Sequence, residues 1–148
     1  MKKILLILAL TLIPKITYAQ SNTICANANN LQFFPISINT ATTTRIANNG
    51  VNPQRAIVPC TLSLTIIGAA APQGLAFISG TGATCGTGTS NITGLMSGPG
   101  AATDTAFWHM PLFPFGKLKT GDSFCVVTST VQQVSGILTY VFVGQATP

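Results

Sequence analysis

The chain has 148 residues, which is enough for one domain with a hydrophobic core. Only 6% of the residues are charged, against about 25% in ordinary soluble domains, and no Lys/Arg cluster exists that could neutralise a row of phosphates. The composition therefore argues against a nucleic-acid partner.

The first nineteen residues have the organisation of a secretory signal peptide. Two lysines open the chain, residues 4–13 form an apolar run, and small residues occupy positions −3 and −1 of a cleavage site before Gln20. The run is well short of the roughly 20 residues that a membrane-spanning helix needs. We therefore expect export and loss of residues 1–19. Lys15, late for such a signal, leaves an uncleaved membrane anchor as the alternative.

The chain left after cleavage, residues 20–148, is expected to be a single domain with little charge. Its charged residues are Arg45, Arg55, Lys117, Lys119, Asp104 and Asp122. The polar residues are mainly Thr, Ser, Asn, Gln and Gly. Such a surface gives little repulsion between identical copies, so it permits self-association.

Period-two alternation of apolar and polar residues recurs along the chain and predicts β-strands. Strands are expected at Phe34–Ile38, Thr42–Ala47, Val58–Ile66, Leu75–Ser79, Ile92–Met96, Thr105–Met110, Ser123–Ser129 and Ser135–Val143. Turn residues separate these strands, with loops expected at residues 80–89 and 97–103. About eight short strands of this kind predict an all-β fold, a β-sandwich or jelly roll.

Two of these strands carry further information about the core. In the third, Val58, Cys60, Leu62, Leu64 and Ile66 alternate with polar residues or proline and are expected to share one core-facing side. The last strand is apolar on both faces. A central strand buried on both sides explains this pattern. A face that meets another subunit is the alternative.

Residues that could carry catalysis are scarce. His109 is the only histidine and lies in an apolar segment, and Asp104 cannot share its strand face. No Gly-x-Ser-x-Gly motif occurs, and the glycine-rich segment 80–89 lacks the Lys-Ser/Thr of a phosphate-binding loop. We therefore expect no enzymatic activity and no cofactor.

Aromatic residues offer the best candidates for ligand or interface contacts. Segment 107–115 has the highest density of aromatics, for which core packing is the ordinary explanation. Aromatic side chains on a β-scaffold can also stack on sugar rings or anchor a protein interface. The candidate contact residues are Phe107, Trp108, His109, Tyr140 and Phe142.

Four cysteines follow the signal peptide: Cys25, Cys60, Cys85 and Cys125. Export places them in an oxidising compartment, so two disulfides are expected, with three connectivities open. Metal ligation is the competing explanation. The closest two cysteines are 25 positions apart, which lacks the short spacing of metal ligands, so no metal site is expected.

Five segments of the chain carry a resemblance to a group of known proteins. They are Gly80–Thr89, Phe124-Cys125, Val134–Tyr140, Pro35-Ile36-Ser37 and the strand from Arg55 to Cys60. In these segments the chain resembles small β-rich, disulfide-containing proteins of phage, prophage and environmental bacterial sequences. The resemblance implies pairing of the first cysteine with the second and of the third with the fourth. It also implies a virion-associated or surface structural role.

The leading expectation for function is an exported structural or surface-binding module that assembles as a homo-oligomer. It would be secreted, periplasmic or at the cell surface, and virion proteins are among its expected partners. A carbohydrate-binding or adhesin domain that contacts a cell-surface glycan through Trp108 is one alternative. A pilus-like subunit, whose sheet a partner strand completes, is another.

Overall fold

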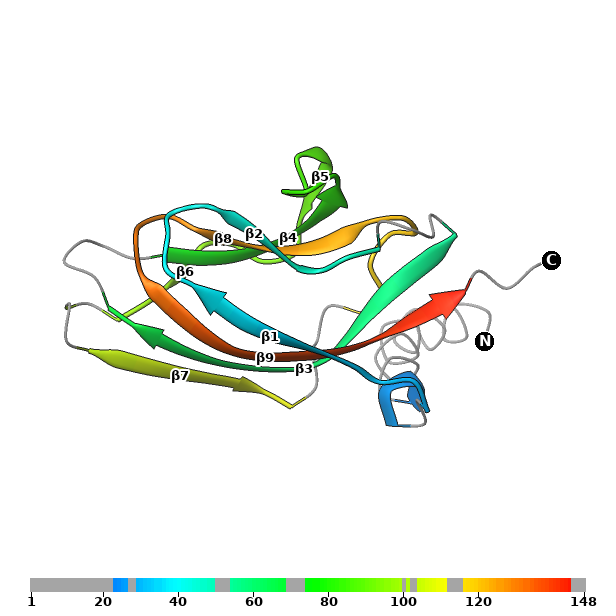
Figure 1. Cartoon of the computed structure of the whole chain (residues 1–148), viewed down its shortest axis with the longest axis horizontal. Coiled ribbons are helices and arrows are strands. Elements are labelled where there is room, and N and C mark those ends of the chain that lie inside the picture. Colours follow the sequence, from blue (N-terminus) through cyan, green and yellow to red (C-terminus); the bar gives the residue numbers. More distant parts are fainter. Residues whose placement is uncertain are drawn as a thin grey trace, which may run out of the picture.

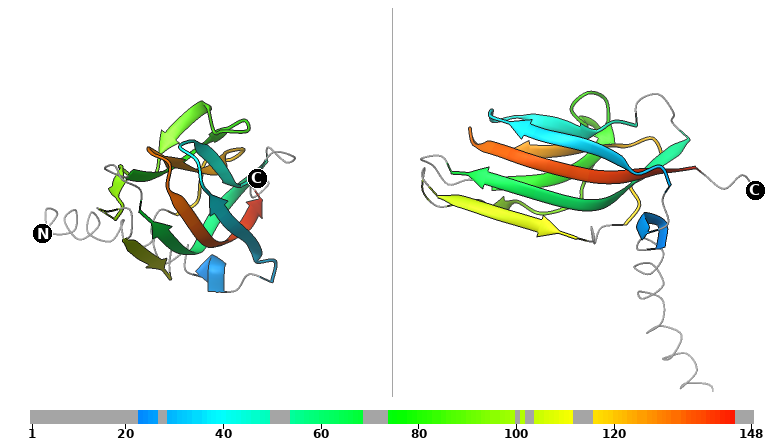
Figure 2. Two further views of the ribbon diagram at one scale, coloured as in Figure 1. Left: turned by 60° about the vertical axis from the view of Figure 1, so that its left-hand side comes forward. Right: turned by 60° about the horizontal axis from the view of Figure 1, so that its bottom comes forward.

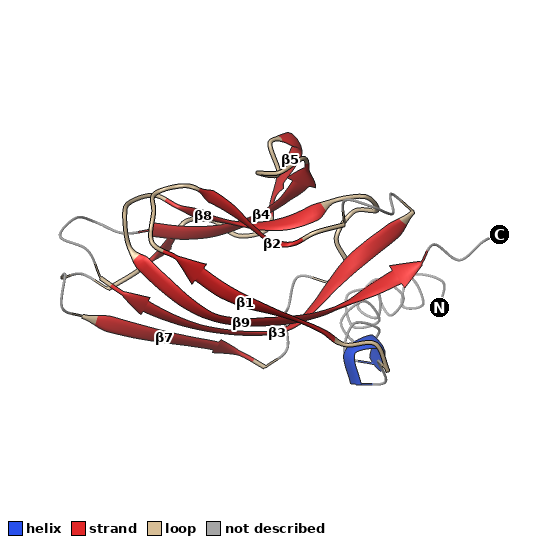
Figure 3. Ribbon diagram, viewed as in Figure 1, coloured by secondary structure: helices blue, strands red, loops and turns tan. Residues whose placement is uncertain are grey.

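Nine strands make up most of the described chain (Figures 1 and 3). The computed structural model describes residues 23–26, 29–49, 54–68, 74–99, 101, 104–111 and 116–144, so the expected signal peptide lies outside it. The strands are β1 (Gln32–Ile38), β2 (Thr43–Ala47), β3 (Arg55–Ile67), β4 (Gly74–Thr81), β5 (Thr87–Asn91), β6 (Met96–Ser97), β7 (Thr105–Met110), β8 (Ser123–Thr128) and β9 (Gln133–Gly144). Residues 23–26 form a single helical turn.

The strands form two antiparallel sheets that pack face to face. One sheet has the order β1-β9-β3-β7, and the other has the order β2-β8-β4-β5 with β6 paired to β4. Figure 2 shows the four strands of the first sheet side by side, with β7 at its margin. The all-β sandwich expected from the alternation is therefore confirmed.

The core lies between the two sheets. Phe77 of β4 and Phe124 of β8 are fully buried and stack with their ring centroids 5.4 Å apart. From the other sheet, Leu62 and Ile66 of β3 and Leu138 of β9 are equally buried in the same cluster. Burial of each such side chain stabilises the fold by about 1.5–3 kcal/mol.

A β-bulge at Cys60 changes which side of β3 faces the core. The register against β9 shifts at this residue. Beyond the bulge, alternate residues from Leu62 to Ile66 point into the core, as expected. Before it, Ile57 is in the core, while Val58 and Cys60 pack in a separate cluster. The prediction that Val58 and Cys60 share the core-facing side is wrong, because period-two counting slips by one residue at a bulge.

Seven of the expected strands are present with similar bounds, and β7 has the bounds predicted for it. The strand expected at Ile92–Met96 is wrong, since residues 92–95 form bends and loop. The first three residues of the strand β5 lie instead in the glycine-rich segment 80–89, which was expected to be a loop. All five of its residues are exposed, so it has no buried face that alternation could reveal.

Both disulfides have the pairing that the family resemblance implies. Cys25 is bonded to Cys60 and Cys85 to Cys125, with Cα–Cα distances of 5.6 and 6.3 Å. The first attaches the N-terminal helical turn to the bulge of β3. The second attaches the β4–β5 connection to β8. The four cysteines are thus all paired, as expected for an oxidising compartment.

Candidate interaction surface

The outer face of the β1-β9-β3-β7 sheet, which points away from the second sheet, carries several exposed apolar side chains. We define it by Phe33, Pro35 and Ser37 of β1, Ile137 of β9, Ser63 and Thr65 of β3, and Phe107 and His109 of β7. The register places Pro35, Ile137, Ser63 and His109 in one row across the four strands. Phe107 is 76% exposed, Phe33 63% and Ile137 42%. This face therefore exposes three large apolar side chains to solvent.

The chain itself covers the other end of this sheet. Val58 and Cys60 of β3 and Val141 of β9 are buried there beneath the N-terminal turn. Ile24 and Leu31 from the N-terminal segment pack against them. Apolar side chains of the N-terminal segment therefore cover the part of β3 and β9 that is apolar on both sides. The outer face starts where that cover ends.

A shallow hollow of about 220 Å³ lies on the outer face between β7 and β9. Phe107, His109, Ser63 and Ile137 are among its lining residues. The Oγ of Ser63 lies 2.7 Å from Nδ1 of His109, in a hydrogen bond whose direction depends on the His109 tautomer. The lining contains no carboxylate that could orient the imidazole as a base, so this pair lacks the third group of a nucleophilic triad.

The five contact residues expected from the sequence do not gather at one place. Phe107 and His109 lie on the outer face, while Trp108 packs partly buried against the core. Tyr140 and Phe142 also point into the core, where their rings meet edge to face at 5.4 Å. Phe113 and Phe115, from the same aromatic segment, lie outside the described residues. Only Phe107 and His109 thus remain as candidates for contact on this surface.

Sequence reasoning missed Phe33 and Ser63 as members of the surface. Phe33 precedes the strand expected from residue 34, so its alternation with Pro35 and Ser37 was not included. Nothing in the sequence around Ser63 distinguishes it from the many other serines of the chain. Its relevance comes from the register that places it opposite His109.

Burial raises the pKa of Tyr140 above its ordinary value of about 10. The folded state therefore favours the neutral phenol, and this stabilisation is present below about pH 10 and lost as pH rises through the folded pKa. Tyr140 is the only tyrosine of residues 20–148, so tyrosinate absorbance reports on it alone. We expect a higher titration midpoint in the folded protein than in urea. Equal midpoints would contradict the burial, and Tyr140→Phe, which lacks the signal, is the control.

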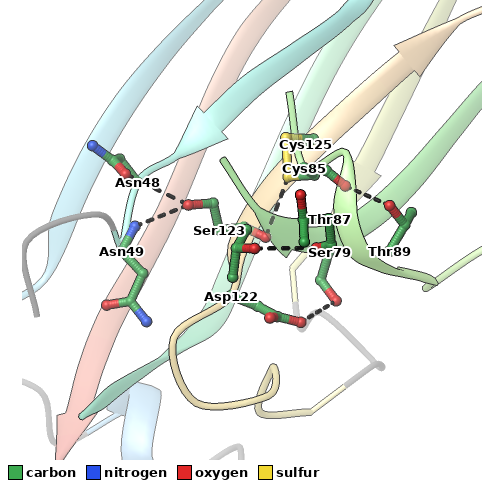
Figure 4. Close-up of a disulfide and its surroundings, with 10 residues drawn as sticks. Asn48, Asn49, Ser79, Cys85, Thr87, Thr89, Asp122, Ser123 and Cys125 are labelled. Atoms are coloured by element: carbon green, nitrogen blue, oxygen red, sulfur yellow. Dashed lines mark hydrogen bonds between the residues drawn. A yellow bond between two sulfur atoms is a disulfide. The ribbon is translucent and has the colours of Figure 1, made fainter. Parts of the chain in front are cut away.

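A group of polar side chains surrounds the Cys85–Cys125 disulfide, away from the outer face (Figure 4). Ser79 Oγ donates a hydrogen bond of 3.0 Å to the buried carboxylate of Asp122. The backbone N–H of Asn49 donates to Ser123 Oγ at 3.2 Å. These bonds connect β4, β8 and the segment after β2, so we assign them to holding the sandwich together.

A hollow of about 390 Å³ opens beside this region. Arg45, Asn48, Thr81 and Ser123 are among the residues that line it. Within the described part of the chain, no group of three or more His, Cys, Asp or Glu side chains could hold a metal ion. No helix among the described residues is long and apolar enough to cross a membrane.

Comparison with known proteins finds matches only at the level of structure, because no family model and no curated protein matches the chain. A chain of the Bacillus endospore appendages, described as disulfide-linked pili, is 11% identical with a TM-score of 0.41, over 79% of this chain and 87% of that one. A chain of the viral particle of infectious bursal disease virus is 10% identical with a TM-score of 0.34, over 79% of this chain and 32% of that one. A chain of the Gx strain of that virus is 9% identical, with a TM-score of 0.35 and coverage of 82% and 34%. These similarities concern the β-rich fold alone, and the chain spans about a third of the two viral chains.

Proposed function

We propose that this protein is an exported, non-enzymatic structural subunit that assembles with copies of itself. The observation that carries the proposal is the outer face, where Phe33, Ile137 and Phe107 stand exposed on one side of a single sheet. Large exposed apolar side chains gathered on one face of a soluble protein mark a contact site. This face is therefore suited to binding another molecule rather than to catalysis.

A second copy of the chain is the partner that the charge distribution favours. The strands β1, β7 and β9 contain no Lys, Arg, Asp or Glu, and β3 carries only Arg55, at its first residue. Two identical copies can therefore bring these strands together without placing like charges opposite each other. A charged partner would find no complementary group on this face.

The positions of His109 and Asp122 are the observations behind the non-enzymatic part of the proposal. His109 and Ser63 form a pair without an orienting carboxylate in the hollow. The carboxylate of Asp122 is buried and accepts a hydrogen bond from Ser79, so it serves the fold. Loss of a measured turnover on His109→Ala would contradict the proposal.

Glycan binding is the second candidate for the same face. Phe107 stands beside the hydroxyl groups of Ser63 and Thr65 at the hollow, and aromatic rings next to hydroxyls are a common way to hold a sugar. A glycan array probed with the mature protein tests this candidate. Specific binding that Phe107→Ala abolishes and that leaves the protein monomeric would favour the glycan over self-assembly.

Export is part of the proposal and rests on the organisation of residues 1–19. The two disulfides support it, because disulfides persist in oxidising compartments. N-terminal sequencing of the secreted protein should begin at or near Gln20, and precursor retained in the membrane would contradict export. Neighbouring tail and capsid genes would favour a virion-associated subunit, and chaperone and usher genes a pilus-like one.

Light scattering of the purified mature protein tests self-assembly directly. We expect a mass of at least two chains at micromolar concentration, since no described segment of the chain covers the apolar side chains of the outer face. The mass should fall on dilution if the contact is reversible. A mass of one chain even at high concentration would overturn the proposal.

A further inference from the structure

The edges of the two sheets differ in how well they are protected from pairing with another chain. An edge strand presents unpaired N–H and C=O groups, and natural proteins block such edges with proline, charges, bulges or very short strands. In the described chain the edge strands are β1 and β7 of one sheet, and β2, β5 and β6 of the other, of which β6 has only two residues.

Three of the longer edge strands carry a blocking feature. Pro35 lies in the middle of β1 and lacks an N–H. Arg45 places a positive charge in β2, and the register of β2 shifts directly after it. The pairing of β5 also shifts, between Ser79 and Thr81 of β4, and Gly88 within β5 has a φ of 62°. Each feature interrupts the flat, regular edge that a further strand would need.

The edge of β7 has none of these features. Its six residues, Thr105 to Met110, include no proline, glycine, lysine, arginine or carboxylate. It pairs with β3 in unbroken register from Ile67↔Thr105 to Leu62↔Met110. No described strand pairs with its other side. It also carries Phe107, the most exposed of the large apolar side chains described.

We propose that β7 pairs antiparallel with β7 of a second copy, about a two-fold axis through Phe107. The inference rests on the proposed self-assembly and adds to the contact of the outer face a second contact, at the sheet edge. The two four-stranded sheets then become one continuous sheet, with both outer faces on the same side. Such isologous pairing closes after two copies.

Self-complementarity of the β7 sequence favours the axis at Phe107. Residues directly opposite in an antiparallel pair lie on the same side of the sheet. With Phe107 opposite its own copy, two aromatic rings meet on the outer face. On the inner side, Ala106 lies opposite Trp108 of the second copy, so a small residue faces a large one. An axis at Trp108 would instead place the two tryptophans opposite each other.

Cysteine cross-linking tests both the edge and the register. Opposite residues of an antiparallel pair have Cα atoms about 4.5–5.5 Å apart, within the range of a disulfide. The four native cysteines are paired, so the added thiol in Phe107→Cys is the only free one. We expect oxidation to convert most of the mature F107C protein to a covalent dimer. F33C, on the edge of β1, and H109C, off the proposed axis, should stay mostly uncross-linked.

A charge substitution provides the second readout. Lysine on an edge strand opposes pairing, and two lysines would meet at the axis in Phe107→Lys. Because Phe107 is largely exposed, F107K should keep the circular dichroism of the wild type while its dimer dissociates at least tenfold more readily. The matched variant V131K, at an exposed apolar residue that lies outside the outer face, should leave the β7 contact unchanged.

The outcomes separate this inference from the proposed function. A wild-type oligomer in which F107C cross-links no better than F33C and H109C would overturn the β7 pairing and leave self-assembly standing. A wild type that is monomeric at high concentration would overturn both. If F107K fails to fold, the cross-linking result decides alone.

Discussion

Replacing Cys85 and Cys125 together by alanine is expected to lower the free energy of unfolding by about 2–5 kcal/mol. The disulfide closes a loop with a sequence separation of 40 and ties the glycine-rich connection before β5 to β8. Both cysteines are fully buried, so their removal also takes packed atoms away from Ile78. Apart from its pairing with β4, the strand β5 has no buried side chain that packs onto the sandwich.

Urea unfolding of the mature double variant measures this loss, with Cys25→Ala/Cys60→Ala as the matched control. The control removes a loop of similar separation, 35, so its loop-closure contribution is nearly the same. Hydrogen exchange should then separate the two variants. Faster exchange in β5 is expected only without Cys85–Cys125. If both variants unfold at the wild-type urea midpoint, the disulfides do not contribute as proposed.

Alternation predicted the strands that have one face on the core. For β7, the residues Thr105 to Met110 alternate between exposed and half-buried, and its predicted bounds are those observed. For β5, every residue is exposed, so nothing in its Thr, Gly, Ser and Asn sequence distinguishes it from a loop. Backbone pairing with β4, which leaves no mark in hydrophobicity, is what makes it a strand.

The interaction surface was harder to predict than the fold, because it depends on which strands are neighbours. Tyr140 and Phe142 are aromatic like Phe107, yet they face the core from β9. Ser63 and His109 meet although 46 positions separate them. The bulge at Cys60 also turns Val58 away from the main core, toward the N-terminal turn. None of these placements follows from period-two counting along a single strand.

The two sides of β9 are central to the choice between an internal strand and an interface strand. The strand lies between β1 and β3, so it is central in its sheet. Its inner side holds Leu138, which is fully buried. Its outer side is divided: the N-terminal turn covers Val141, while Ile137 remains 42% exposed. The central-strand explanation therefore accounts for Val141, and Ile137 is the residue of this strand to which the proposed interface applies.

Leu138→Asp is expected to lower the free energy of unfolding by more than about 4 kcal/mol, because it deletes a core side chain and buries a carboxylate without a partner. Ile137→Asp, one position earlier and on the other face, should cost only about 1 kcal/mol through reduced β-propensity. Its charge would stand in the middle of the outer face. We therefore expect I137D to stay folded and to lose the contacts that this face makes with another copy.

Urea unfolding and light scattering of the two mature variants, measured side by side, check this contrast. The midpoint of L138D should collapse, or the protein should fail to fold, while I137D should unfold near the wild-type midpoint with a smaller mass than the wild type. Ile137→Val is the control that keeps the face apolar, and it should retain the wild-type mass. An I137D protein with the full wild-type mass would show that Ile137 lies outside the contact, and assembly would then have to use another surface, such as the β7 edge alone.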